Sequence, residues 1–326
     1  MTKRIACATL FCITAALLSL MLGAAQLGLQ QLWRCILEGP GSTAGYIFWY
    51  VRLPRTAACL LSGAALSVSG AVIQSVLNNH LASPGIIGVN AGAGLAVTVC
   101  CALGLLSGWA VAGAAFAGAV LCALLIVFVA EKVGASRTTV ILGGVAVNAF
   151  LNALSEAVTT LVPEAGMMAG DFRVGGFSAV SHLRLIPAGI LILAGLTLLF
   201  SLSNELEVLS LGEETAQALG MPVKRMRTVF LILAAMLCGC AVSFAGLVGF
   251  VGLIIPHGVR KISGTARQCF LPLCALWGAG FVAICDVLAR VAFAPFELPV
   301  GILLSVLGGP FFLGLLLKRK GGRSHA

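Results

Sequence analysis

Continuous apolar runs dominate this chain of 326 residues and limit what it can fold into. Hydrophobic residues make up 60% of the sequence, charged residues only 10%, and the mean hydropathy is +1.09. An α-helix needs about 20 apolar residues to cross the hydrocarbon core of a bilayer, so the chain has room for roughly ten spans. The runs do not alternate with polar residues, as the strands of a membrane β-barrel would. We therefore predict an all-α polytopic membrane protein.

Ten apolar runs qualify as spans, although the eighth is too short for a full crossing. We place them at residues 5–30, 50–77, 86–106, 109–130, 138–161, 185–203, 228–246, 247–260, 268–290 and 298–317. If the N-terminus is cytoplasmic, alternate crossings put both termini and most of the 20 bases on the cytoplasmic side, as the positive-inside rule expects. The first run reaches about Leu29, which favours a retained helix over a cleaved signal peptide.

A polar stretch, Asn204–Arg227, interrupts the apolar runs and predicts a cytoplasmic connection. Glu213 and Glu214 favour the first turn of a short helix. Gly220 favours the end of that helix, and Pro222 prevents its continuation. Such a helix would lie on the membrane surface, and an ordinary solvated loop is the alternative. Residues Arg52–Leu161 before the stretch give one set of four spans, and Arg227–Leu317 after it give another. An odd number of crossings between the two sets would give them inverted topology, a common transporter plan.

Six arginines fall on the predicted outer side, and three of them mark the ends of spans. Arg52 and Arg55 open the second span, and Arg290 closes the ninth. The remaining three are Arg34, Arg173 and Arg184. These arginines could anchor the spans at the membrane interface, or they could dock acidic groups of a partner protein. Topology alone supports the two alternatives equally.

Polar side chains form one face of the fifth span, at helical spacings of four, three and four: Asn148, Asn152, Ser155 and Thr159. In a membrane such a stripe faces either a partner helix or an aqueous path. Two ionisable residues also lie within spans. Asp286 precedes Arg290 by four residues, which favours a structural ion pair over a proton relay. Glu156 has no obvious partner, and it could line a wet cavity or meet an outer arginine.

Other classes of site find little support in the sequence. No GxxxxGK[ST] phosphate loop occurs, so any ATP would be bound by another chain. The 12 cysteines include no CxxC pair and mostly lie in apolar runs, which favours buried thiols over disulfides or metal ligands. His257 stands alone and would make a poor metal site. We find no nucleophile–base set and no HExxH motif, and therefore expect neither an enzyme site nor a cofactor on this chain.

Several longer motifs occur in an order that is typical of one known family. RLPR at 52–55 is followed by SGAALSVSGAVIQSVLNNHLASPGIIGVNAGAG, in which His80 stands where the family has proline. The other motifs are LGEETAQALG at 211–220, GLVGFVGLIIPHGVRKISG at 246–264, DVLAR at 286–290 and FELPVGILLSVLGGPFFLGLLLKR at 296–319. Together they resemble the FecCD-type permeases, the membrane subunits of ATP-binding-cassette (ABC) importers for ferric siderophores, haem and vitamin B12.

The resemblance implies partners: a second permease chain in a homodimer or heterodimer, two cytoplasmic ABC ATPase subunits that use ATP, and an extracytoplasmic substrate-binding protein. It places the chain in the cytoplasmic membrane of a prokaryote. The short helix would couple to the ATPases through Leu211, Gly212, Glu213, Glu214, Ala216, Leu219 and Gly220. Arg52, Arg55 and Arg290 match arginines that face acidic residues of the binding protein. The fifth span would lie beside the translocation path, where Gly301 and Ser305 of the tenth could form the opposite wall or allow close packing.

We divide the single permease domain, 1–326, by role: 1–49 first helix and external loop, 50–161 first helix set, 162–203 external segment and sixth helix, 204–227 cytoplasmic coupling loop, 228–317 second helix set, 318–326 cytoplasmic tail. The expected function is import of an iron chelate, such as a ferric siderophore, or a related large cofactor. Haem and cobalamin are alternative cargoes, because permeases for all three share these motifs, and the identity of the second permease chain also stays open. An ion-coupled secondary transporter with inverted repeats is the alternative from a different class, and it would depend on Glu156 or Asp286.

Overall fold

The computed structural model describes residues 2–23, 28–85, 87–133, 137–263, 269–292, 294 and 296–321, and no strand occurs among them. The long helices are α1 (Thr2–Met21), α4 (Leu53–Val76), α5 (Val89–Ala102), α6 (Gly108–Val133), α7 (Arg137–Leu161), α10 (His182–Ser201), α13 (Val223–Ala245), α14 (Val251–Ser263), α15 (Phe270–Val291) and α16 (Val300–Gly321). The short helices are α2 (Leu29–Glu38), η1 (Gly39–Gly41), α3 (Thr43–Ile47), η2 (Phe48–Arg52), α8 (Pro163–Met168), α9 (Gly170–Val174), α11 (Ser203–Ser210) and α12 (Glu213–Ala218).

Seven helical segments are long and apolar enough to cross a membrane, and they contain α1, α4, α6, α7, α10, α13 and α15. Two shorter apolar helices, α5 and α16, and the 13-residue α14 complete the set. These helices match the ten predicted spans one to one. The predicted all-α polytopic fold is therefore confirmed, and the eighth span is short as expected.

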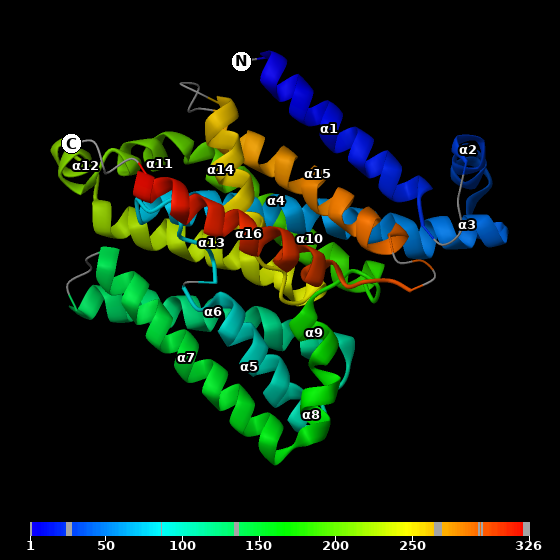
Figure 1. Cartoon of the computed structure of the whole chain (residues 1–326), viewed down its shortest axis with the longest axis horizontal. Helices are drawn as coiled ribbons and strands as arrows, with labels where there is room; N and C mark the ends of the chain where they lie inside the picture. The colour runs from blue at the N-terminus through cyan, green and yellow to red at the C-terminus, as the bar shows by residue number, and fades with distance from the viewer. Residues whose placement is uncertain are drawn as a thin grey trace.

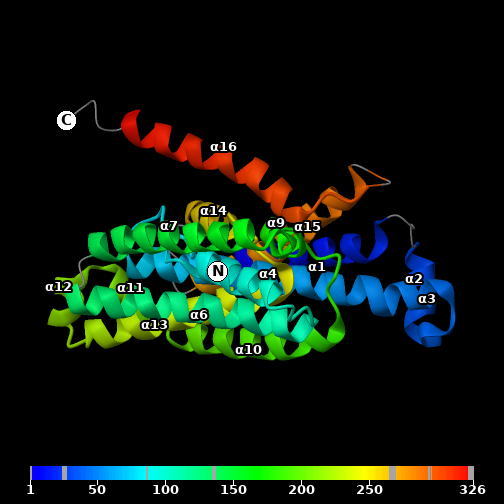
Figure 2. The same ribbon diagram turned by 90° about the horizontal axis from the view of Figure 1, so that it is seen from below.

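Most of the spans run side by side along the long axis of the molecule, whereas α14 crosses it steeply in Figure 1 (Figure 1, Figure 2). Helices α2 and α3 lie at one end of the bundle, which we name the α2 end. Helices α11 and α12 lie at the opposite end, which we name the α12 end. In Figure 2, α16 starts beside α15 and diverges from the bundle as it runs toward the C-terminus. One long face of α16 is therefore not covered by the rest of the chain.

Helix α4 is the centre of the bundle, where it packs against α13, α14 and α15. Glycines make this close approach possible, because the backbones of Gly63 in α4 and Gly278 in α15 touch directly. A side chain at either position would collide with the carbonyl oxygen of the other. Gly70 meets Gly252 of α14 in the same way, and the Gln74 amide donates to the Gly252 carbonyl at 3.0 Å.

Helices α5, α6 and α7 form a second group, which joins the rest of the bundle mainly through α6 and α13. One continuous cluster of buried apolar side chains runs through both groups. The two predicted four-helix sets therefore share one core, because α4 belongs to the first set and packs with helices of the second. All 12 cysteines are free thiols, and ten of them are buried, as the sequence predicted.

The first span differs from its prediction. It ends at Met21, not at residue 30, and the chain forms the separate helix α2. Polar side chains recur along α2, with Gln30, Arg34 and Glu38 four residues apart. A helix with that polar face is poorly suited to the hydrocarbon core, which explains why the apolar run does not continue as one span.

The predicted coupling loop at 204–227 is also more helical than expected. It contains most of α11, all of α12 and the first turn of α13. The short helix ends at Ala218, just before the left-handed Gly220 that was predicted to stop it, and Pro222 stands immediately before the first residue of α13. The seventh span consequently begins at Val223, not at residue 228. Of the predicted tail at 318–326, residues 322–326 lie outside the described part of the chain.

Candidate functional site

Two of the three arginines at helix ends share one buried carboxylate at the α2 end of the bundle. Asp286 of α15 is 1% exposed. Its oxygens accept hydrogen bonds from Nε and Nη2 of Arg55 at 3.0–3.2 Å, and one of them lies 3.1 Å from Nε of Arg290. The ion pair predicted between Asp286 and Arg290 is therefore present. A buried carboxylate is tolerated here because both neighbouring cations neutralise it and donate to it.

Groups of α1 complete this network. Arg290 Nη2 donates to the Ser19 carbonyl at 3.2 Å and contacts the Ser19 hydroxyl at 3.1 Å. Arg52 Nη1 donates to the Leu20 carbonyl at 2.6 Å. The arginines thus connect α1, α4 and α15, and they are 4%, 8% and 6% exposed at positions 52, 55 and 290. Both predicted roles, anchoring and docking, require accessible head groups, so either role requires part of this network to open.

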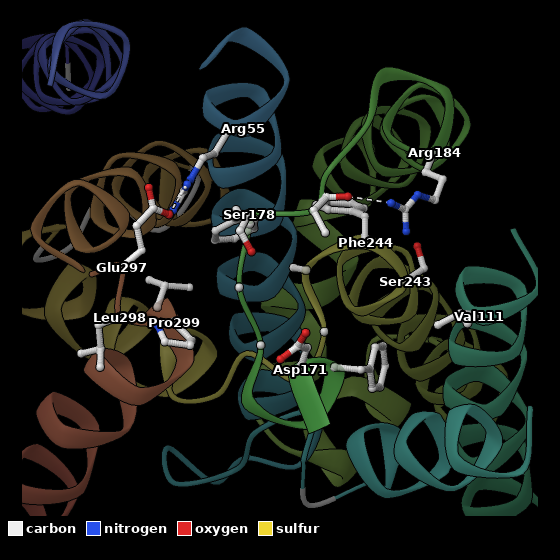
Figure 3. A pocket seen from close by; sticks show the side chains of 18 of the residues that line it. Arg55, Val111, Asp171, Ser178, Arg184, Ser243, Phe244, Glu297, Leu298 and Pro299 are labelled. Atoms are coloured by element: carbon white, nitrogen blue, oxygen red, sulfur yellow. Dashed lines mark hydrogen bonds and ion pairs between the residues drawn. The ribbon is translucent and has the colours of Figure 1, made fainter. Parts of the chain in front are cut away.

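Glu297 covers the remaining side of Arg55 (Figure 3). Its Oε2 lies 2.8 Å from Nη1 of Arg55, and its side chain is 41% exposed. Figure 3 shows this pair beside a cavity of about 300 Å³, which Asp171 and Arg184 also line. Sequence analysis assigned no role to Glu297, although an acid within the apolar C-terminal motif was a signal that could have been followed.

A second cavity, of about 560 Å³, lies between α5, α7 and α9. Three members of the predicted polar stripe line it, namely Asn148, Asn152 and Ser155, and so does Glu156. The structure thus supports the interpretation that Glu156 lines a cavity. Sequence analysis gave no specific role to Arg173 of α9, whose Nη2 donates to the hydroxyls of Ser155 at 2.5 Å and Thr98 at 3.3 Å. No spacing rule could pair Arg173 with Thr98, which lies 75 residues away.

Three residues predicted for the path lie outside this cavity. The Thr159 hydroxyl donates to the carbonyl of Glu156, one turn earlier in α7. Gly301 of α16 packs against the backbone of Val174, and its amide donates to Gly175 at 3.1 Å. Ser305 lies on the exposed side of α16, where its hydroxyl donates to the Gly301 carbonyl at 2.8 Å. Their roles in a path stay predictions, because α16 of the single chain diverges from the rest of the bundle.

The short helix α12 forms at Glu213–Ala218, within the predicted segment. Glycines bound it, with φ angles of 120° at Gly212 and 80° at Gly220 that favour a residue without a side chain. Arg227 of α13 holds the helix start through an ion pair of 2.9 Å to Glu213. The other residues predicted to couple divide by side: Ala216 is buried, while Glu214 and the apolar Leu211 and Leu219 are exposed.

The sequence matches the model of the FecCD transport family over residues 10–318. The chain belongs to the FecCD transport family. It is 38% identical over 325 residues to the vitamin B12 import system permease protein BtuC of Escherichia coli O127:H6, covering 96% of this chain and 94% of that protein. It is 36% identical over 304 residues to the Fe(3+)-citrate import system permease protein YfmD of Bacillus subtilis, covering 93% and 90%.

A solved structure supports the same assignment. It is described as an inward-facing conformation of a metal-chelate type ABC transporter, and its TM-score with this chain is 0.87 at 29% identity. The match covers 98% of this chain and 100% of the other. This FecCD-family chain is therefore a transport permease of a bacterial inner membrane, with several membrane-crossing helices.

Proposed function

We propose that this FecCD-family chain is the membrane subunit of an ABC importer that moves an iron chelate, such as a ferric siderophore, into the cytoplasm. The observation that carries this proposal is the nearly full-length similarity to two import permeases. Their named cargoes, vitamin B12 and Fe(3+)-citrate, are both organic molecules that hold a metal. Cobalamin and haem are therefore the alternative cargoes.

The exposed helices support a second permease chain in this proposal. Only 11% of the apolar window of α7 is buried, and α16 diverges from the bundle. Large apolar side chains stand exposed on both helices, including Phe150 of α7 and Leu313 of α16. A second copy, or a similar permease, would cover these faces and close the polar cavity beside α7 into a path. Lipid alone would leave Asn152 and Glu156 against hydrocarbon, which is unfavourable.

The ATPase subunits would bind at the α12 end. Basic residues gather in the connections of that end, among them Lys132, Lys224 and Arg225, so the positive-inside rule places it in the cytoplasm. The exposed Leu211 and Leu219 beside α12 offer apolar contacts to a partner. The chain lacks a phosphate loop, so the partner would bind and hydrolyse ATP. The substrate-binding protein would dock at the opposite, α2 end, near Arg52, Arg55 and Arg290.

The direct test is to purify the tagged chain from its native cell in a mild detergent and identify its companions by mass spectrometry. We expect an ABC ATPase at one copy per permease chain. A tagged polytopic protein from the same membrane serves as the control for nonspecific recovery. Recovery of this chain alone across several mild detergents would contradict the importer proposal and would favour an ion-coupled transporter, for which Glu156 is the first residue to change.

ATP-dependent uptake identifies the cargo. Proteoliposomes that hold the purified complex and its binding protein would be offered a ferric siderophore, Fe(3+)-citrate, haem and cyanocobalamin separately. We expect accumulation of an iron chelate only when ATP is present on the ATPase side. Accumulation of cyanocobalamin or haem alone would assign the cargo to the alternative, and accumulation without ATP would contradict the ABC mechanism.

A further inference from the structure

Arg55 cannot accept an acidic group from outside while it is bound as the structure shows. Its side chain is 10% exposed, and it already pairs with both Asp286 and Glu297. These two carboxylates differ in how firmly they are held. Asp286 is 1% exposed and is shared with Arg290. Glu297 is 41% exposed, and Arg55 is the one partner of its carboxylate among the described residues.

The charges of the network add to this asymmetry. Three arginines, Arg52, Arg55 and Arg290, gather at this end of the molecule around two carboxylates, Asp286 and Glu297. An additional carboxylate from outside would therefore be attracted to this end of the molecule. It could reach Arg55 only by replacing Glu297, because Asp286 lies behind the guanidinium in the buried interior.

We propose that Glu297 is an internal substitute for a docking carboxylate: it occupies Arg55 until an acidic side chain of the substrate-binding protein displaces it. This inference rests on the proposed function, in which that protein docks at the α2 end. It accounts for arginines that are predicted to dock and yet are buried and paired. Arg55 is thus already paired in the resting permease, and it exchanges one carboxylate for another when the partner arrives.

The position of Glu297 connects this exchange to the helices beside the polar cavity. The next residue, Leu298, donates its amide to the Ala289 carbonyl at 3.1 Å. Gly301, at the start of α16, donates to Gly175 at 3.1 Å, just after the α9 helix that carries Arg173. Release of Glu297 would remove the ion pair beside these backbone hydrogen bonds, so docking would weaken the attachment of the connection that leads into α16.

The test measures affinity of the purified binding protein for the permease–ATPase complex in lipid nanodiscs. We expect Glu297→Gln to tighten binding by about 2–6-fold, because it removes a half-exposed competing ion pair. Glu297→Ala should tighten it at least as much. Glu164→Gln, which removes an exposed acid of α8, is the matched control and should leave affinity unchanged. Unchanged or weaker binding in both Glu297 variants would overturn the proposal, as would equal tightening in the control.

A double-mutant cycle assigns the effect to Arg55. In an Arg55→Gln background, Glu297→Gln should no longer tighten binding, because the competed group is absent. An equal gain in that background would overturn the exchange. If the wild-type complex binds no protein partner at this end, the proposed function fails as well. Normal binding by the wild-type complex with unchanged affinity in the Glu297 variants would overturn the exchange alone.

A second and independent observation concerns α2. Four large apolar side chains stand 50–69% exposed along one face of this helix, namely Leu29, Trp33, Ile36 and Leu37. The adjoining face carries Gln30, Arg34 and Glu38. Leu32 and Cys35, on the edge of the apolar face, pack against Phe48 and hold the helix to the bundle. The exposed apolar face is thus separate from the packed one.

Hydrogen bonds fix the level of α2 relative to the spans. The indole of Trp49 donates to the Cys35 carbonyl at 3.0 Å, and the Trp49 carbonyl bonds to His182 at 2.7 Å. His182 is the first residue of α10, so α2 lies where a span begins. The helix lies across the direction of the spans in both views (Figure 1, Figure 2). The geometry points to an interfacial helix whose apolar face enters the headgroup–acyl boundary of the outer leaflet.

Photo-crosslinking tests this placement in the full complex. Trp33→p-benzoylphenylalanine should yield phospholipid adducts in membranes, detected by mass spectrometry. The same residue placed at Arg34, on the polar face, is the control and should yield few. Adducts of the binding protein at position 33, no lipid adduct there, or equal lipid adducts at both positions would each overturn the assignment.

Discussion

Replacing Asp286 with asparagine removes the central charge of the network at the α2 end while keeping the size of the side chain. Asp286 is 1% exposed and accepts hydrogen bonds from Arg55 while pairing with Arg290. Without its charge, two buried guanidinium groups lose their shared partner, and only the half-exposed Glu297 remains for Arg55. Removal of one partner from a buried ion pair costs about 3–5 kcal/mol. The retained amide oxygen can still accept one hydrogen bond, so we expect a value near the lower end.

This free energy converts into a measurable shift in melting temperature. An unfolding entropy of about 2.1 cal/mol/K per residue amounts to roughly 0.7 kcal/mol/K for a chain of this length, so about 3 kcal/mol lowers Tm by roughly 4 °C. The assay is thermal unfolding of the detergent-purified complex at one fixed heating rate, because membrane complexes commonly unfold irreversibly. Asp171→Asn is the control, since the Asp171 carboxylate is exposed and has no partner in the described part of the chain.

A second variant tests the reason for the loss. Asp286→Asn combined with Arg290→Met removes one of the two uncompensated cations, so the double variant should be less destabilised than Asp286→Asn alone. A loss of Tm in Asp286→Asn no larger than in the Asp171 control would contradict the buried ion-pair explanation. Simple addition of the losses of the two single variants would contradict it as well.

Three further predictions test other parts of the molecule. Gly70→Ala should destabilise the protein by about 1–3 kcal/mol in a melting assay, because the added methyl group meets the backbone of α14. At the control position, Gly113→Ala, the methyl group meets no atom, so this variant should be neutral or slightly stabilising. Leu219→Asp should leave the fold intact, because the Leu219 side chain is 64% exposed. The variant should lower uptake while ATP hydrolysis continues, and normal uptake would contradict a coupling role for Leu219. Arg227→Gln removes the ion pair that holds Glu213 at the start of α12, so the uptake per ATP hydrolysed should fall. Arg227→Lys should retain much of this uptake. An unchanged ratio in Arg227→Gln would show that the ion pair does not hold α12 for coupling.

Local features of this protein were predictable from sequence. The Asp286–Arg290 pair lies one helical turn apart, so spacing alone predicted it, and the left-handed Gly220 just after the end of α12 followed from residue type. The polar stripe of the fifth span was likewise predicted from helical spacing, and Asn148 and Asn152 do line a common cavity. In each case the interacting groups lie within one helix, whose geometry is known before the fold is.

Long-range partners escaped the same reasoning. Arg55 meets Asp286 across 231 residues and Glu297 across 242, and nothing in either local sequence indicates the other. Arg173 reaches the polar stripe from α9 only because the chain turns back after α7. The helix α2 is different, because its polar residues recur every fourth position and a search for amphipathic periodicity beyond Met21 would have found it.

Composition and motifs are enough to identify the chain as a helical membrane protein of the FecCD family. Its apolar runs are long enough to cross a bilayer, and a backbone in hydrocarbon must satisfy its hydrogen bonds within each helix, so span and helix follow together from composition. Which charged side chains meet depends on the folded bundle. Helix packing is set by small residues such as Gly63 and Gly70 in α4, which bring α15 and α14 into backbone contact. The positions of Arg55, Asp286 and Glu297 relative to one another therefore depend on the whole bundle.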